Sequence, residues 1–128
     1  MIVLDTSALM AIVQGEAEAT MCRDAIGAHA DLLIAAPNLS ETLVVAAGRR
    51  LHGEMERLLE ELGPSVVPLT EKRAYAATRA YLAWGKGFHP AHLNFGDCFA
   101  YALAKEHDCA LLFVGDDFAA TDVKGALD

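Results

Sequence analysis

The sequence predicts an α/β fold, a three-layer sandwich in which helices cover both faces of a central, mainly parallel sheet. Two observations lead to this prediction. Four short apolar runs alternate along the chain with longer segments of helical periodicity, and strands that alternate with helices usually form parallel sheets. Each run is apolar throughout rather than at every second position, as is typical of strands that are buried on both faces.

The first strand is expected at residues 2–4, which read Ile-Val-Leu. A helix over residues 8–13 follows, because the intervening Asp-Thr-Ser at 5–7 consists of residues that favour helix N-termini. Gly15 ends this helix, and residues 16–29 have the amphipathic pattern of a second helix.

The second strand is expected at residues 32–36, and Pro37 then favours the first turn of a helix that extends to about residue 50. A further helix over residues 52–62 carries Met and Leu at helical spacing opposite a row of Glu. The third strand is expected at residues 65–69. The remaining elements are a helix over 71–84, an irregular segment at 85–93, a helix over 94–107 and a fourth strand at 109–114.

The composition is that of a folded chain without membrane spans. With 128 residues, of which 54% are hydrophobic and 22% charged, we expect one domain over residues 1–128 rather than a disordered chain. No apolar run reaches the ~18 residues of a membrane span, and the N-terminus lacks the basic region of a secretion signal. We therefore expect a cytoplasmic protein that does not associate with membranes.

The charge balance constrains the ligands. Eighteen Asp and Glu against ten Lys and Arg give a net charge of −8, which disfavours tight nonspecific binding to nucleic acid and favours cations or a basic partner. The three cysteines include no C-x-x-C pair, so neither a disulfide framework nor a zinc site is predicted.

Four acidic residues are placed differently from the others, which mostly lie on solvated helix faces. Asp5 directly follows the first strand, and Glu41 lies in the first turns of the helix after the second strand. Asp97 lies in the first turn of the helix that begins at Asn94, and Asp116 comes two residues after the fourth strand. In a parallel α/β sheet these positions meet at the edge where ligands bind.

Each of these acids also has a structural explanation, as a helix cap, a partner of the helix dipole or a turn residue. Four of them at one edge indicate more than this, because carboxylates in one concave site repel each other unless cations neutralise them. An all-oxygen ligand set favours Mg²⁺ or Mn²⁺. One or two such ions can activate water and stabilise a phosphoryl displacement.

The chain resembles the PIN-domain ribonucleases of the VapC toxin type. The resembling motifs are Ile-Val-Leu-Asp-Thr-Ser-Ala at 2–8, Ser-Glu-Thr at 40–42, Asn-Phe-Gly-Asp-Cys at 94–98, Gly-Asp-Asp-Phe at 115–118 and Thr-Asp at 121–122. The resemblance implies a PIN-like fold and a Mg²⁺- or Mn²⁺-dependent endoribonuclease that is the toxin of a type II toxin–antitoxin system.

The resemblance also implies roles for individual residues. Asp5 and Asp97 would be the principal metal ligands, and Glu41 would ligate a metal or orient its water. For the fourth acid, Asp116 is chosen as the nearest to the strand end, with Asp122 as the second choice. All four acids, Asp116 included, are thus expected to be catalytic.

Neighbouring polar residues are assigned to the same site. Thr6 or Ser7 would hydrogen-bond a water ligand or the scissile phosphate, or would only cap a helix, and Asn94 would position Asp97. The implied partners are the RNA substrate, a homodimer mate and a cognate antitoxin that inserts an Arg or Lys into the acidic pocket. The segment at 85–93, with Lys86, would contact RNA or be a plain connection.

Two other functions remain as alternatives. One is a non-catalytic PIN-like module that only binds proteins, which the complete set of four acids disfavours. The other is a Mg²⁺-binding receiver domain, which needs an acceptor Asp after the third strand and a Lys after the last strand. The chain has Leu-Thr-Glu at 69–71 and no Lys directly after Val114, so the receiver domain is disfavoured as well.

Overall fold

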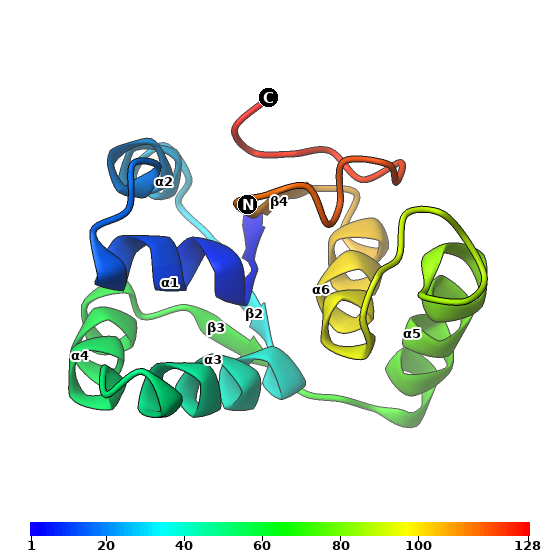
Figure 1. Cartoon of the computed structure of the whole chain (residues 1–128), viewed down its shortest axis with the longest axis horizontal. Coiled ribbons are helices and arrows are strands. Elements are labelled where there is room, and N and C mark those ends of the chain that lie inside the picture. The colour runs from blue at the N-terminus through cyan, green and yellow to red at the C-terminus, as the bar shows by residue number, and fades with distance from the viewer.

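The sheet is the centre of the molecule. The computed structural model describes residues 1–128 and contains four parallel strands in the order β3-β2-β1-β4 (Figure 1). These strands are β1 (Ile2–Leu4), β2 (Leu32–Ala35), β3 (Ser65–Val67) and β4 (Ala110–Leu112). The predicted α/β fold with a parallel sheet is therefore confirmed.

Helices cover both faces of this sheet, so the molecule has three layers. The helices are α1 (Thr6–Gln14), α2 (Ala19–Gly27), α3 (Ala36–Gly48), α4 (His52–Leu62), α5 (Glu71–Trp84) and α6 (Phe95–Glu106). Figure 1 shows α1 to α4 together on one side of the strands and α5 with α6 on the other. None of these helices combines the length and the apolar character that crossing a membrane requires.

The central strand β1 explains why the apolar runs are continuous. Side chains alternate between the two faces of a strand, and Ile2 and Leu4 pack in the core under α1 to α4 while Val3 packs in the core under α5 and α6. All three side chains are fully buried. A strand with no solvent-facing side needs no polar residue at alternate positions.

The element boundaries differ from the predicted ones by a few residues. The first helix begins at Thr6 rather than at residue 8, because the Asp5 side chain caps it by accepting from the Ser7 backbone N–H. The second helix begins only at Ala19, and β3 and β4 are shorter than predicted. The segment at 85–93 is irregular, as expected, and an isolated bridge between Gly85 and Leu93 closes it into a compact loop.

Candidate active site

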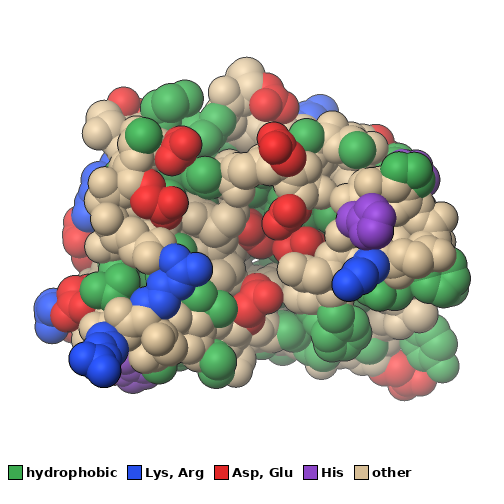
Figure 2. Space-filling view, viewed as in Figure 1, with side chains coloured by type: hydrophobic (Ala, Val, Ile, Leu, Met, Phe, Trp, Pro, Cys, Tyr) green, Lys and Arg blue, Asp and Glu red, His purple; other side chains and the backbone are tan.

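An open cleft of about 550 Å³ lies at the carboxyl end of β1 and β4. Asp5, Glu41, Asp97 and Asp117 all line it, and Arg49 is its only basic lining residue. Figure 2 shows red acidic side chains gathered around a hollow in the middle of this face. The convergence of Asp5, Glu41 and Asp97, which are far apart in the sequence, is therefore present in the structure.

Asp5 is fixed by the start of α1. Its Oδ2 accepts hydrogen bonds from the Ser7 Oγ at 2.6 Å and from the Ser7 backbone N–H at 3.1 Å. The Ser7 Oγ in turn accepts from the Val114 backbone N–H at 3.0 Å, just beyond β4. Ser7 therefore joins the ends of two neighbouring strands and orients the Asp5 carboxylate, which is only 4% exposed.

Glu41 is held from two sides through one of its oxygens. The Thr6 hydroxyl donates to Glu41 Oε1 at 2.7 Å, and the Asn38 side-chain amide donates to the same oxygen at 3.3 Å. Asn38 also donates to the Gly96 carbonyl at 2.9 Å, so that its amide connects α3 to the first turn of α6. Asn38 is fully buried, and the only sequence signal for its role is that it precedes Glu41 by almost one helical turn.

Asp97 belongs to a capping box at the start of α6. The Asn94 side chain accepts from the Asp97 backbone N–H at 2.8 Å, and Asp97 Oδ2 accepts from the Asn94 backbone N–H at 3.1 Å. Asn94 thus orients Asp97, and the capping interpretation and the site interpretation are both compatible with this geometry.

The donor set fits a hard divalent cation. In Asp5, Glu41 and Asp97 one carboxylate oxygen is held by protein donors, and the other oxygen of each makes no hydrogen bond within the protein. Carboxylate oxygens of this kind are the ligands that Mg²⁺ and Mn²⁺ prefer. The side chains do not yet form a compact group of three that could hold an ion, so binding would need side-chain adjustment.

The electrostatics of the cleft also favour a cation. Burial raises the pKa of Asp5 to about 6. The hydrogen bonds from Ser7 lower this pKa, and the charges of Glu41 and Asp117 raise it by smaller amounts. Burial likewise raises the pKa of Asp97 to about 7, and the charges of Asp5, Asp117 and Glu41 add to it. Each carboxylate is thus costly to ionise in the absence of a positive charge.

The acidic residues after β4 are arranged differently from the predicted choice. Asp116 and Asp117 are both exposed, but only Asp117 lines the cleft, and its charge acts on Asp5 and Asp97. The turn at 115–117 begins with Gly115, whose φ is +96°. Asp116 is the acid closest to the strand end, but nothing in the sequence alone shows which of two adjacent Asp residues faces the cleft.

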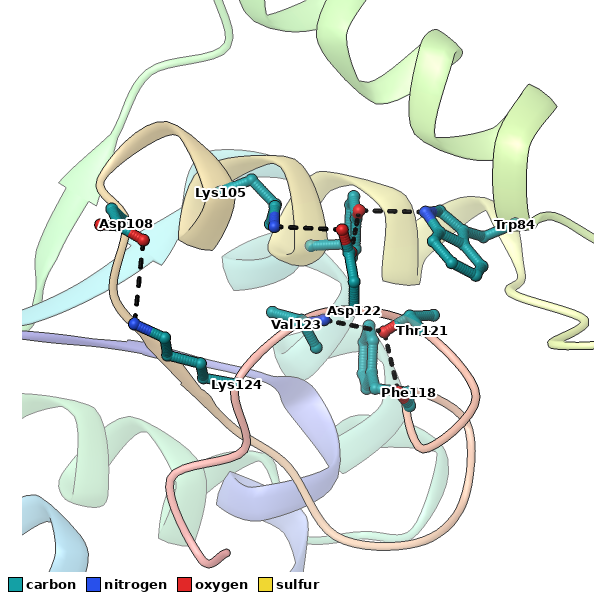
Figure 3. Close-up of polar contacts among 9 residues, drawn as sticks. Trp84, Lys105, Asp108, Phe118, Thr121, Asp122, Val123 and Lys124 are labelled. Carbon is teal, nitrogen blue, oxygen red and sulfur yellow. Dashed lines mark hydrogen bonds and ion pairs between the residues drawn. The ribbon is translucent and has the colours of Figure 1, made fainter.

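Asp122, the second choice for the fourth acid, has other partners. Its carboxylate accepts from the Tyr101 hydroxyl and pairs with Lys105 at 3.2 Å, and the Tyr101 hydroxyl accepts from the Trp84 indole at 3.0 Å (Figure 3). These contacts fasten the C-terminal segment to α5 and α6. Asp122 is not among the residues that line the cleft.

The sequence and the fold are similar to those of known proteins. The family model for the PIN domain matches residues 2–124. Ribonuclease VapC36 of Mycobacterium tuberculosis is 45% identical over 95% of this chain and 91% of its own length, and Ribonuclease VapC28 of the same species is 42% identical over 98% of both chains.

Two solved structures have a similar fold. The crystal structure of VapC20 from Mycobacterium tuberculosis, described as a Sarcin-Ricin loop cleaving toxin, matches with a TM-score of 0.76 at 17% identity over 96% of both chains. A toxin–antitoxin complex from Klebsiella pneumoniae contains a chain that matches with a TM-score of 0.71 at 18% identity, over 95% of this chain and 93% of that one. With a family model that spans nearly the whole sequence and relatives above 40% identity, the chain belongs to the PIN-domain family and, within it, to the VapC proteins.

Proposed function

We propose that this VapC protein is an endoribonuclease that hydrolyses RNA phosphodiester bonds at the acidic cleft and depends on Mg²⁺ or Mn²⁺. The observation that carries the proposal is that Asp5, Glu41 and Asp97 each present one unpartnered carboxylate oxygen at one cleft. Its full-length relatives are named ribonucleases, which supports RNA as the substrate and the toxin role.

The residues of the chain divide into ligands and positioning groups. Asp5, Glu41, Asp97 and Asp117 would hold the metal, and Ser7 and Asn94 orient two of them through the hydrogen bonds described above. A bound divalent cation would supply Lewis acidity toward the phosphate and activation of the attacking water. We propose Asp117, in place of Asp116, as the fourth acid because Asp117 lines the cleft.

The proposal is tested by cleavage of a labelled RNA with Mg²⁺, with Mn²⁺ and with EDTA. We expect metal-dependent cleavage by the wild type and its loss in Asp5→Asn and Asp97→Asn. Asp116→Asn is the matched control, because it removes the same charge outside the cleft. Equal cleavage by all variants would reveal a contaminating nuclease. A folded wild type without cleavage on any RNA would favour the non-catalytic module.

We also propose a protein antitoxin as partner. The support is the toxin–antitoxin complex whose chain shares this fold, together with the net charge of −8, which suits a basic segment that neutralises the cleft. If a small protein is encoded beside this gene, co-expression with it should give a stable complex that does not cleave RNA. Failure to co-purify would contradict the pairing.

A homodimer in the cytoplasm, where RNA is available, completes the proposal. The most exposed large apolar side chains lie on α3, α5 and α6, namely Val44 at 68%, Tyr75 at 62% and Phe95 at 71%. Burial of such side chains against a second copy would remove apolar surface from water. Light scattering of the purified chain should give twice the monomer mass, and a monomer at micromolar concentration would contradict the dimer.

A further inference from the structure

The basic residues of this acidic chain fall into two groups. Five of the ten Lys and Arg form ion pairs with carboxylates, and these are Arg23, Arg57, Arg73, Lys105 and Lys124. The other five have no carboxylate within ion-pair distance, although acids outnumber bases by 18 to 10. These five are Arg49, Arg50, Lys72, Arg79 and Lys86.

The unpaired cations occupy two places in the fold. Arg49 lines the acidic cleft at the C-terminal end of α3, with Arg50 next to it. Lys86 lies near another part of the cleft lining, because its backbone N–H donates to the carbonyl of Leu93 at 2.9 Å and Leu93 directly precedes the lining residue Asn94. The remaining two, Lys72 and Arg79, line a separate groove between α5 and α6.

The surface view agrees with this arrangement. In Figure 2 a basic side chain lies on the left of the acidic hollow, and a basic side chain with a histidine lies on its right, where Figure 1 places the segment between α5 and α6. The acidic floor is therefore flanked by positive charge on two sides. The segment that carries Lys86 is held in place by backbone bonds from His89 to Gly85 and from Leu93 to Trp84.

We infer that Arg49 and Lys86 are RNA-binding residues that hold phosphates on either side of the scissile one, so that the strand crosses the cleft from α3 to the loop at 85–93. The inference deepens the proposed ribonuclease function and rests on it. A polyanion is the ligand that matches the charge pattern, since neutralisation of phosphates by Lys and Arg dominates affinity for nucleic acid. It also explains how a chain of net charge −8 can bind RNA.

Binding is measured by fluorescence anisotropy with a labelled single-stranded RNA in Mg²⁺ buffer, with every protein carrying Asp97→Asn to prevent cleavage. We expect Arg49→Gln and Lys86→Gln each to raise the Kd several-fold. Each should also lower the slope of log Kd against log salt by roughly 0.7, the value for one phosphate contact with a single strand. Arg79→Gln and Lys124→Gln are the controls and should change neither quantity.

The outcomes separate this inference from the proposed function. If Lys72→Gln and Arg79→Gln weaken binding and the cleft variants do not, RNA lies in the groove between α5 and α6 and the inference is overturned. It is also overturned if no variant changes the Kd. If the wild-type chain, with its Asp97 intact, does not cleave RNA, the ribonuclease function is contradicted, whichever Lys and Arg residues bind RNA.

Discussion

Gly96 contacts the Glu41 carboxylate so closely that no side chain fits between them. A Cβ at Gly96 would overlap Glu41 Oε2 and would lie 3.2 Å from Oε1. Gly96 lies inside α6 and its φ is not in the left-handed region. The glycine is therefore required for space beside a cleft carboxylate and not for an unusual backbone conformation.

This contact predicts that Gly96→Ala will displace Glu41. Alanine normally stabilises a helix by about 0.5–1 kcal/mol over glycine, but here its Cβ must push the carboxylate out of place. Misplacement of this kind can cost on the order of a hundredfold in rate, and we expect a loss of that size in RNA cleavage. Gly53→Ala in α4, whose Cβ would only meet Arg57 at 3.6 Å, is the control that should cleave normally.

Asn38 should act through Glu41 as well as through the fold. Asn38→Ala removes both amide hydrogen bonds and leaves the Gly96 carbonyl without its donor, which should destabilise the protein by about 1–3 kcal/mol. It should also lower cleavage in the wild type but add nothing in a Glu41→Gln background. Equal effects in the two backgrounds would reduce Asn38 to a purely structural residue. Chemical denaturation measures the free energy of unfolding, and initial rates measure RNA cleavage.

The two adjacent aspartates after β4 should behave differently. Asp117 lines the cleft and Asp116 does not, so Asp117→Asn should weaken Mn²⁺ binding and lower cleavage, while Asp116→Asn should leave both unchanged. Isothermal titration calorimetry with Mn²⁺ gives the affinity without any need for RNA. Weaker binding in Asp116→Asn alone would identify Asp116, the acid nearest the strand end, as the fourth acid of the site.

The raised pKa values predict that the metal-free protein loses stability as the pH rises. The folded pKa values of Asp5 and Asp97 are about 6 and about 7, against 3.8 for an ordinary Asp. In the pH range between 3.8 and these raised values, the folded state therefore binds more protons than the unfolded state. Folding is then disfavoured increasingly as the pH rises through this window. Each unit of pKa shift is worth about 1.4 kcal/mol.

The matched measurement compares wild type and Asp97→Asn by urea unfolding in EDTA at pH 5 and pH 8. The asparagine keeps an acceptor for the Asn94 backbone N–H but carries no charge. We expect the variant to gain stability relative to the wild type between pH 5 and pH 8, and Mg²⁺ to stabilise the wild type at pH 8. A stability difference that does not vary with pH would contradict the raised pKa of Asp97.

The fold and the backbone of the site could be predicted from sequence because they depend on local patterns. Continuous apolar runs identified the four strands, and the position of Asp5, Glu41 and Asp97 after strands or at helix starts placed them at one edge. What such patterns do not encode is the direction of a side chain within a turn. The sequence pattern therefore favours Asp116, the acid nearer the strand end, whereas Asp117 lines the cleft in the structure.

Contacts between distant elements were also beyond the sequence patterns. The role of Asn38 depends on the Gly96 carbonyl, which lies 58 residues away in the chain. Gly96 itself could be recognised as part of a motif, but its closeness to Glu41 depends on how α3 and α6 cross. Packing of this kind is a property of the whole fold, and no periodicity within one element reports it.

Asp122 is expected to stabilise the C-terminal segment rather than to support cleavage. The Tyr101 hydroxyl holds the pKa of Asp122 below its usual value, with Lys105 contributing in the same direction. Tyr101→Phe removes this donor and leaves the Trp84 indole without its acceptor, so it should lower the free energy of unfolding by about 1–2 kcal/mol. Metal-dependent cleavage below the melting temperature should be retained in Tyr101→Phe and in Asp122→Asn. If Asp122→Asn instead abolished Mn²⁺ binding with its stability intact, Asp122 would belong to the metal site, and the C-terminal segment would have to approach the cleft.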